Sequence, residues 1–461
     1  MLHECSAAEL SAAYARRKLS PLEVTRALLA RVAAWEPCIN AMYRLARDAA
    51  LEQARASEAR WRAGKPLSPL DGVPLTIKEN IHTRGDPAPI GTRANADAPP
   101  QPEDAPPAAR VHEAGCVILG KTTMPDYGML SSGVSSLHGV TRNPWRLDRN
   151  PSGSSSGAAA AAAAGYAPLH LGTDIGGSLR LPAAHCGVFS LKPSLGRVPI
   201  YPPYLGRVAG PLTRTVGDAA LLMNVISRPD ARDFMSLPPA VFKSTVEPLE
   251  ARGMKIGFLP DMRVGLPVHG EVRAAAEAAA RALGREGAQV EEMKSFLSAE
   301  MLDGMCRFFE ARSYNELAQL PAAKKAKVLP FITEWCTWRA ADFSGRELMQ
   351  AYGWVMAMRE AAAAACQRYD FVLSPTSPVL SYGAEQAAPS NDPRNALPHI
   401  AFTVPHSISE QPAASINWGY SAEGLPIGIQ IIGRRFDDAG VLGLARTIET
   451  LRPAQRAWPE P

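Results

Sequence analysis

Three separated segments of the chain each surround one reactive side chain with small residues. They are residues 74–80, 152–157 and 172–180. Lys78 ends an apolar run, where burial would lower the pKa of its ammonium group and leave a neutral amine able to act as a base. Ser178 follows two glycines, which let the backbone turn tightly and aim N–H groups at a developing oxyanion. Taken alone, each also fits a plainer interpretation, a surface lysine after a strand and a serine in an ordinary glycine turn.

Residues 115–122 match the pattern GxxxxGK[ST] of phosphate-binding loops. Such a loop must curl so that its N–H groups converge on phosphate. The apolar residues 116–119 instead favour a buried extended strand, and no convincing acidic strand that would hold a metal ion follows. We therefore predict a structural strand here and no cofactor.

Residues 153–157 match GxSxG, the nucleophile elbow of α/β-hydrolases, with Ser155 at its centre. An elbow needs a preceding apolar strand and, later in the chain, an acid and a histidine. Residues 149–152 instead have the composition of a loop, although His399 and His406 could serve as the late histidine. An esterase that uses Ser155 therefore stays an alternative.

The composition argues against several other classes of function. Lys plus Arg number 49 against 45 for Asp plus Glu, so a formal net charge of +4 indicates neither nucleic-acid nor membrane binding. None of the nine histidines forms HxH, HExxH or a close pair with acids, so we expect no metal.

The seven cysteines are scattered and form no CxxC pair, which favours a reducing cytoplasm. The chain has neither a leader-like start nor an apolar run of about 18 residues, so we expect it to be cytoplasmic.

The elements that must position these residues alternate between helices and strands. Apolar residues recur at helical spacing over 7–63, which predicts two or three amphipathic helices. From Pro69 onward, short apolar runs closed by Gly or Pro alternate with helical stretches, the α/β pattern. The alanines of 158–164 predict a tightly packed buried helix, and the proline-rich residues 228–250 a connection. Residues 296–365 predict helices whose aromatic side chains either pack a core or form a pocket or lid.

The sequence resembles the amidase signature family in an ordered series of motifs that runs nearly end to end. Besides the three segments above, the matching residues are 20–23, 70–74, 114–122, 143–145, 210–215, 373–376 and 424–430. The resemblance implies an α/β fold, with a mixed twisted β-sheet core covered by α-helices on both faces. It also implies one domain over residues 1–461, with the signature core at about 68–220 and a helical excursion or lid at about 296–365.

By this resemblance, Lys78 is the base, Ser154 the bridging serine and Ser178 the nucleophile. Neutral Lys78 accepts the proton of Ser154, Ser154 accepts that of Ser178, and Ser178 attacks the carbonyl carbon. The resemblance also implies a cis peptide bond between Gly153 and Ser154. The expected outcome is hydrolysis through an acyl-enzyme, which water then releases.

The resemblance further assigns the groups around the reacting serines. The expected oxyanion donors are the backbone N–H groups of Ile175, Gly176, Gly177 and Ser178. The expected supporting residues are Ser155, Thr173, Asp174 and Arg180, with hydrogen bonds and an ion pair among them, and Gln430 is a further candidate. Ser152 and Ser156 stand where the family usually has glycine, and Glu79 where aspartate is usual.

The implied substrates are small molecules with amide C–N bonds, including anilides and carbamates (urethanes), and also esters. The loop over 197–207 and the aromatic residues of 296–365 favour a hydrophobic or aryl substrate. The candidate pocket residues are Gly128, Met129, Tyr204, Arg207 and Trp335. We expect a monomer or homodimer without nucleic acid or membrane. The alternatives are an amidotransferase A-type subunit that works with partner subunits and a non-catalytic binding protein.

Overall fold

A computed structural model describes residues 1–204, 206–242 and 246–461. Its strands are β1 Met42–Leu45, β2 Pro74–Lys78, β3 Val117–Thr122, β4 Val134–Ser135, β5 Gly139–Val140, β6 Leu169–Asp174, β7 Phe189–Lys192, β8 Val208–Thr213, β9 Lys255–Phe258, β10 Gln289–Glu292, β11 Phe371–Pro375, β12 Ala413–Tyr420 and β13 Pro426–Gly433. Within the described residues, eleven of them form one sheet in the order β1-β3-β2-β6-β8-β7-β12-β13-β11-β9-β10, while β4 and β5 pair separately. Strands β2, β3 and β6 are parallel, and β8 and β7 run antiparallel to their neighbours. The sheet is therefore mixed, as predicted.

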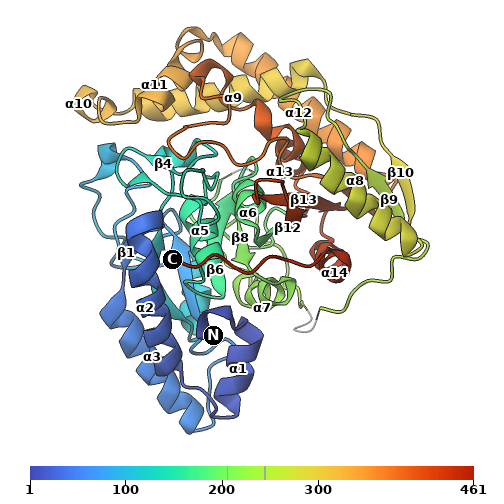
Figure 1. Cartoon of the computed structure of the whole chain (residues 1–461). Coiled ribbons are helices and arrows are strands. Elements are labelled where there is room, and N and C mark those ends of the chain that lie inside the picture. The colour runs from blue at the N-terminus through green and yellow to red at the C-terminus, as the bar shows by residue number, and fades with distance from the viewer. Residues whose placement is uncertain (205, 243–245) are drawn as a thin grey trace.

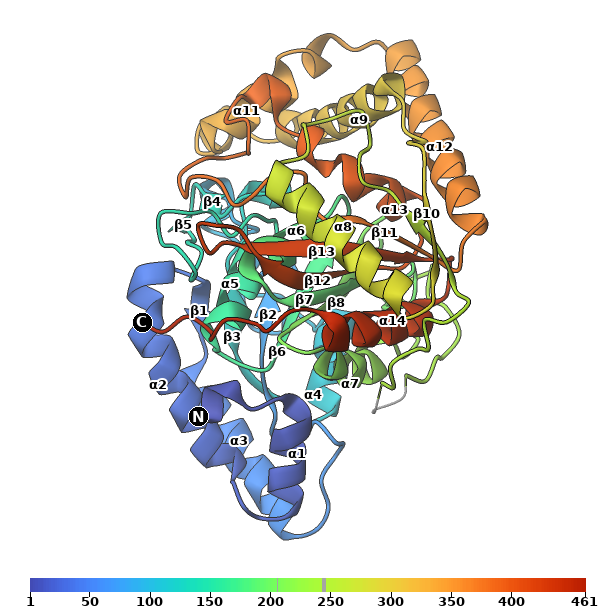
Figure 2. The same cartoon turned by 45° about the vertical axis from the view of Figure 1, so that its right-hand side comes forward.

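Helices cover both faces of this sheet (Figures 1 and 2). They are α1 Ala7–Ala15, α2 Pro21–Ile39, α3 Arg47–Arg62, α4 Pro106–Glu113, α5 Ser156–Ala164, α6 Arg180–Cys186, α7 Val216–Ile226, α8 Gly270–Arg285, α9 Ala299–Ala318, α10 Ala322–Lys325, α11 Pro330–Thr337, α12 Gly345–Gln367, α13 Val404–Ile408 and α14 Asp438–Leu451. Helices α3, α7, α8 and α14 pack with the strands in one continuous apolar core. Helices α5 and α6 pack on the sheet in a separate apolar cluster. This arrangement confirms the predicted fold class.

The central strands are buried along their whole length, which explains their continuous apolar runs. Strand β3 includes the residues that match the phosphate-loop pattern, so they form a structural strand, as predicted. The buried Lys121 ammonium donates to the Thr83 hydroxyl at 2.9 Å and to the Ile81 carbonyl oxygen. Its hydrogen-bond donors are thus used inside the protein, and the backbone of this segment is extended rather than curled around an anion.

The alanine-rich segment forms helix α5, and all of its residues are buried, as predicted. Alanine side chains let this helix approach its neighbours closely, and it contacts both α6 and β6. Gly157 lies in its first turn, where a Cβ atom would come within 2.3 Å of the Ala41 carbonyl oxygen. The packing therefore requires glycine at the end of α5 that faces the site.

The N-terminal region differs from the expectation of helices alone. Helices α1, α2 and α3 form, but β1 separates α2 from α3 and pairs antiparallel with β3. Asn40 ends α2 in the left-handed conformation with φ of 50°, which asparagine tolerates better than most residues. The chain therefore leaves the helix sharply and enters a short edge strand.

The segment 296–365 forms α9 to α12 as predicted, and these helices lie together at the end of the molecule opposite α1 (Figures 1 and 2). Helices α9 and α12 pack against each other, and α11 packs on α9. Their apolar side chains join a cluster with Leu181 of α6 and Phe402 before α13. These helices thus cover the side of the sheet that carries α6; a lid function stays a prediction.

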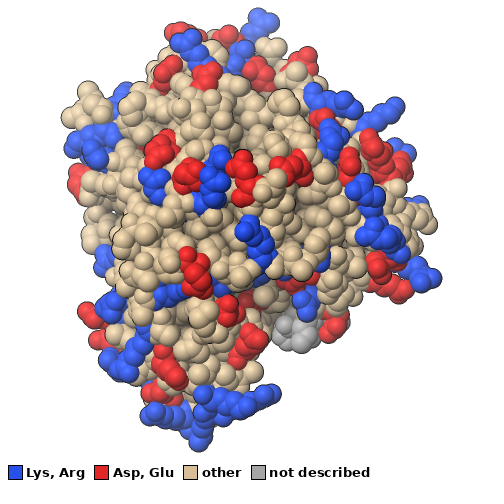
Figure 3. Space-filling model, viewed as in Figure 1, with Lys and Arg blue, Asp and Glu red and all other residues tan. Residues whose placement is uncertain are grey.

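The predicted connection 228–250 contains no helix or strand in its described part, and residues 243–245 lie outside the described residues. Leu205, within the loop 197–207, also lies outside them. None of the described helices is long and apolar enough to cross a membrane. On the face shown in Figure 3, basic and acidic side chains are mostly interspersed.

Candidate active site

Lys78 lies at the carboxyl end of β2, between β3 and β6, with its side chain fully buried. Its Nζ atom contacts three hydroxyl oxygens, Ser154 Oγ at 2.8 Å, Ser155 Oγ at 3.1 Å and Thr173 Oγ1 at 3.0 Å. Because β2 and β6 are parallel, their carboxyl ends meet at one edge of the sheet, where α/β proteins place their sites. The structure therefore brings the predicted lysine and bridging serine into direct contact.

Burial lowers the pKa of Lys78 to about 7. The Asp174 carboxylate opposes this shift, and the Arg207 guanidinium adds to it. A lysine with this pKa is half neutral near pH 7, and the neutral amine can accept a proton. The geometry and the protonation equilibrium of Lys78 both suit a base.

Ser154 follows a cis peptide bond with Gly153, as the resemblance predicted. A Cβ atom on Gly153 would come within 2.6 Å of the Ser132 backbone nitrogen and oxygen. A Cβ atom on Gly128 would lie 3.3 Å from Ser154 Oγ. Closely packed backbone therefore fixes the position of the Ser154 hydroxyl.

Ser178 lies in the turn between β6 and α6 and is partly exposed to the same cavity as Ser154. Gly177 in this turn has φ of 132°, and a Cβ atom there would come within 2.5 Å of Thr403 Oγ1. The turn thus depends on glycine for both its conformation and its packing. Among the described residues, the Ser178 hydroxyl makes no hydrogen bond with Ser154; the two share a cavity wall.

The four expected oxyanion donors are not equivalent. The Gly177 N–H donates to Asp174 Oδ1 at 2.8 Å, so this donor is already engaged. Within the described residues, no hydrogen bond uses the N–H groups of Ile175, Gly176 or Ser178. Three of the four expected donors, the N–H groups of Ile175, Gly176 and Ser178, are therefore free to bind an oxyanion.

The predicted ion pair between Asp174 and Arg180 is present, and both side chains are fully buried. The Asp174 carboxylate also accepts the N–H groups of Gly177 and Leu179, at 2.8 and 3.1 Å. Arg180 donates in turn to Gln430 Oε1 at 2.7 Å. This network ties the turn that carries Ser178 to β13, as a supporting role requires.

Ser155 is completely buried at the N-terminal end of α5. Its Oγ accepts from the Thr173 N–H at 3.2 Å, and its own N–H donates to the Ser178 carbonyl oxygen at 3.2 Å. These contacts join the two serine segments. No strand precedes Ser155 in residues 149–155, so the backbone context of a nucleophile elbow is absent there.

Among the described residues, the late histidines make no hydrogen bond with Ser155. His399 and His406 are buried, and in the described part of the chain their ring nitrogens have no hydrogen-bond partner. Burial lowers the pKa of each to about 3. The same described residues contain no cluster of His, Cys, Asp and Glu that could hold a metal ion.

Ser154 and Ser178 both line a cavity of about 240 Å³. Its lining residues are Asn80, Ile90, Met124, Tyr127, Gly128, Ser154, Thr173, Asp174, Ile175, Ser178, Tyr204, Arg207, Arg312 and Glu316. Three of the predicted pocket residues are among them, Gly128, Tyr204 and Arg207. The other two, Met129 and Trp335, line a cavity of about 30 Å³ that Ser178 also borders. Sequence reasoning missed Arg312 and Glu316, which α9 contributes from a distant part of the chain.

A second cavity, of about 230 Å³, adjoins the first and shares Ile175, Tyr204 and Arg312 with it. Apolar side chains from α9 and α12 dominate its lining, among them Met305, Phe308, Phe309, Tyr352, Val355 and Met356. We refer to it as the apolar cavity. Its position next to the cavity that the serines line suits a hydrophobic portion of a substrate.

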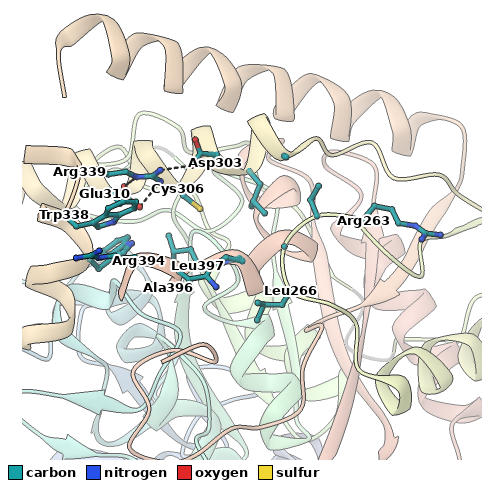
Figure 4. A pocket seen from close by; sticks show the side chains of 17 residues that line it. Arg263, Leu266, Asp303, Cys306, Glu310, Trp338, Arg339, Arg394, Ala396 and Leu397 are labelled. Atoms are coloured by element: carbon teal, nitrogen blue, oxygen red, sulfur yellow. Dashed lines mark hydrogen bonds and ion pairs between the residues drawn. The ribbon is translucent and has the colours of Figure 1, made fainter. Parts of the chain in front are cut away.

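A larger cavity, of about 460 Å³, is lined by none of the reacting residues (Figure 4). Trp335 and Leu397 line both this cavity and the small one beside Ser178. Figure 4 shows Arg339 reaching toward Asp303 and Glu310, to which it donates at 2.9 and 2.5 Å. None of the predicted reacting residues borders it, so size alone does not identify the site.

Comparison with known proteins gives one consistent result. The sequence matches the family described as Amidase over residues 23–442. It is 34% identical to the A-type subunit of glutamyl-tRNA(Gln) amidotransferase from Moorella thermoacetica, covering 100% of this chain and 99% of the relative. It is 33% identical to an acylamidase of Rhodococcus erythropolis, covering 98% of this chain and 96% of the relative.

Among solved structures, a bacterial aryl acylamidase of the amidase signature family superposes with a TM-score of 0.90 at 30% identity, covering 98% of this chain and 96% of the other. The fold, the sequence match and the length of the match thus agree. The chain belongs to the amidase signature family of enzymes, which act on the C–N bonds of amides.

Proposed function

We propose that this chain hydrolyses small amides through an acyl-enzyme on Ser178, with Ser154 and Lys78 as the proton relay. The observation that carries the proposal is the 2.8 Å contact between Lys78 Nζ and Ser154 Oγ in a fully buried setting. Ser154 and Ser178 line one cavity large enough for a small molecule. A buried, partly neutral lysine beside a serine that faces this cavity is the arrangement such a relay needs.

In the proposed reaction, neutral Lys78 takes the proton of Ser154 while Ser154 takes that of Ser178. Ser178 Oγ then bonds to the carbonyl carbon, and the carbonyl oxygen becomes an oxyanion. Collapse of this intermediate breaks the C–N bond, and Ser154 returns a proton to the leaving nitrogen. Lys78 then returns its proton to Ser154, which resets the relay. Water bonds to the acyl carbon as the same relay removes its proton, the bond to Ser178 Oγ breaks, and Ser154 returns a proton to Ser178 as the carboxylic acid leaves.

The free N–H groups of Ile175, Gly176 and Ser178 are the proposed oxyanion donors. Each such donor contributes about 3 kcal/mol to stabilising a transition state. Asp174 holds the turn through the Gly177 N–H, so the donors keep a fixed direction as charge develops. Gly177 thus acts through the shape of the turn and not through its own N–H group.

The proposed substrates are small amides, including anilides and carbamates, and also esters. The names of an acylamidase and an aryl acylamidase among the similar proteins support this class. The apolar cavity beside the serines supports a substrate with a hydrophobic portion. No nucleic acid is needed for the proposed reaction.

The test is hydrolysis of a panel of p-nitroanilides and p-nitrophenyl carbamates by the wild type, Ser178→Ala and Ser155→Ala. We expect turnover by the wild type and its loss in Ser178→Ala, because the nucleophile is gone. Ser155→Ala should retain measurable turnover, since its hydroxyl holds Lys78 without reacting. Undiminished turnover in Ser178→Ala would refute the mechanism, and loss confined to Ser155→Ala would support the esterase alternative.

A second candidate is an amidotransferase A-type subunit, because several similar proteins are named as that subunit of glutamyl-tRNA(Gln) amidotransferase. The discriminating experiment compares the chain alone with the chain mixed with the remaining subunits of the Moorella thermoacetica amidotransferase. Anilide turnover by the chain alone supports the stand-alone amidase. Glutamine hydrolysis that appears only with the added subunits supports the second candidate.

A further inference from the structure

The cavity that holds Ser154 and Ser178 carries more positive than negative charge. Arg207 and Arg312 line it, and Glu316 is the acid beside them. Asp174 also lines the cavity, but the Arg180 guanidinium neutralises it at 3.0 Å. Two arginines therefore share one acid, Glu316, whose carboxylate lies 3.8 Å from Arg312 Nε, in a partly enclosed space.

Both arginines are held against the same aromatic ring. The Cζ atoms of Arg207 and Arg312 each lie 5.5 Å from the ring centroid of Tyr204. Arg312 also lies 5.1 Å from the ring centroid of Phe309. A guanidinium placed over a ring keeps the N–H donors at its edge available for a ligand.

The donors of these arginines are mostly unused by the described residues. Arg207 donates to the Pro202 carbonyl oxygen at 2.5 Å. Within the described residues Arg312 makes no hydrogen bond, and its buried Nε forms only a long ion pair, 3.8 Å from Glu316 Oε1. A guanidinium has five donors, and a buried donor without a partner is unfavourable.

The electrostatics of the cavity agree with this description. Burial lowers the pKa of Arg207, and the nearby Arg312 lowers it further. Burial raises the pKa of Glu316, although both arginines oppose that rise. An anion placed between the guanidinium groups would relieve the repulsion between them.

The cavity of Figure 4 provides the contrast. There Arg339 donates to Glu310 at 2.5 and 3.1 Å and to Asp303 at 2.9 Å. Its charge and donors are thus satisfied by the protein itself. Arg312 lies on the same helix as those two acids but has no comparable pairing.

We propose that the preferred substrate is an amide that carries a carboxylate, which Arg207 and Arg312 bind while the amide carbonyl lies at Ser178. This inference rests on the proposed amide hydrolysis and names its substrate class. The carboxylate belongs either to the acyl portion, as in the monoamide of a dicarboxylic acid, or to the amine portion. The apolar cavity, which shares Tyr204 and Arg312, is placed to receive hydrocarbon next to that charge.

The test compares substrates that differ only in charge. On the acyl side the pair is glutaryl p-nitroanilide and its neutral 4-carbamoylbutanoyl isostere. On the amine side the pair is N-acetyl-4-aminobenzoate and N-acetyl-4-aminobenzamide. In at least one pair we expect kcat/KM to favour the carboxylate by roughly tenfold or more. Equal or lower kcat/KM for the carboxylate in both pairs would overturn the inference.

Variants show which residues cause the preference for the carboxylate. The quantity compared is the ratio of kcat/KM for the carboxylate substrate to kcat/KM for its neutral partner. Arg312→Gln should lower this ratio toward one, because one guanidinium is lost. Glu316→Gln should raise it, because the competing internal acid is removed; this opposite change remains informative if Arg312→Gln folds poorly. Arg307→Gln is the matched control, since Arg307 lies on α9 and pairs with Asp303 at 2.7 Å. An unchanged ratio in both Arg312→Gln and Glu316→Gln would contradict the inference.

Different results would contradict amide hydrolysis by Ser178 and the preference for a carboxylate. Ser178-dependent hydrolysis of the neutral amides without any preference for the carboxylate would leave amide hydrolysis standing and overturn the inference. Turnover that does not depend on Ser178 would refute the proposed mechanism itself.

Discussion

The sheet and the helices that cover it hold their site residues in different ways. Lys78 and Thr173 lie at the ends of neighbouring parallel strands, are buried, and contact one another directly. Arg312 and Glu316 lie one helical turn apart on α9, with 20% and 40% of their side chains exposed. From this difference we infer that the sheet fixes the chemistry and that the helices select the substrate. Replacing a reacting residue at the sheet edge should therefore abolish turnover, and replacing a residue on the helices should change its selectivity.

The largest expected effect is on the base. Lys78→Ala should lower kcat/KM on a p-nitroanilide by about 100- to 10,000-fold, because a general base contributes on that order. The matched control is Lys121→Met on β3, since Lys121 is equally buried and its pKa is also lowered to about 7 by burial. Circular dichroism gives the folded fraction of each variant, to which kcat/KM is normalised. Lys121→Met should keep this kcat/KM within a few-fold of the wild type. Equal losses of kcat/KM per folded enzyme in both variants would contradict the assignment of Lys78 as the base.

The next largest effect concerns the support of the turn that carries Ser178. Asp174→Asn should lower the free energy of unfolding by about 3–5 kcal/mol, because Arg180 is left buried without its counter-charge. The measurement is urea denaturation of the variant and the wild type. A change below about 1 kcal/mol would show that Gln430 and the Thr403 carbonyl suffice for Arg180.

The next effect, of moderate size, is the pH dependence of kcat/KM, which should increase with pH as Lys78 loses its proton. Burial holds the pKa of Lys78 at about 7, and the relay needs the neutral amine. In the free enzyme kcat/KM should therefore rise about tenfold per pH unit below that value and level off above it. A profile of kcat/KM from pH 5 to pH 9 tests this. A plateau that begins only near the ordinary lysine pKa would contradict the assignment.

The smallest expected effect is on the apolar cavity. Phe308→Ala should lower the ratio of kcat/KM for octanoyl over acetyl p-nitroanilide several-fold, because it removes apolar contacts to a long acyl chain. Phe331→Ala is the control, since Phe331 lies on α11 and lines neither that cavity nor the one with the serines. A matching change in both variants would indicate general loosening of the helices.

The residues at the sheet edge were predictable because short local motifs encode them. An apolar strand that ends in Lys78, and a glycine pair before Ser178, specify both the reactive group and its backbone setting within a few residues. The family resemblance then supplied the bridging Ser154, which neither motif alone identifies. The mixed sheet with helices on both faces followed from the same resemblance and from the alternation of strands and helices.

The rest depended on packing between distant segments. Arg312 and Glu316 look like an ordinary solvated helix face, and only the docking of α9 brings them to the cavity. Strand β1 has four residues at the sheet edge and shows too little apolar pattern to separate it from the flanking helices. The engagement of the Gly177 N–H by Asp174 depends on the exact path of the turn, which composition does not encode.

The most direct test of the central claim is to locate the covalent intermediate. The protein is treated with phenylmethylsulfonyl fluoride, and the modified residue is identified by intact mass and peptide mapping. We predict one adduct on Ser178 in the wild type and in Ser155→Ala, and none in Ser178→Ala. An adduct on Ser155, or one that persists when Ser178 is replaced, would contradict the assignment of the nucleophile.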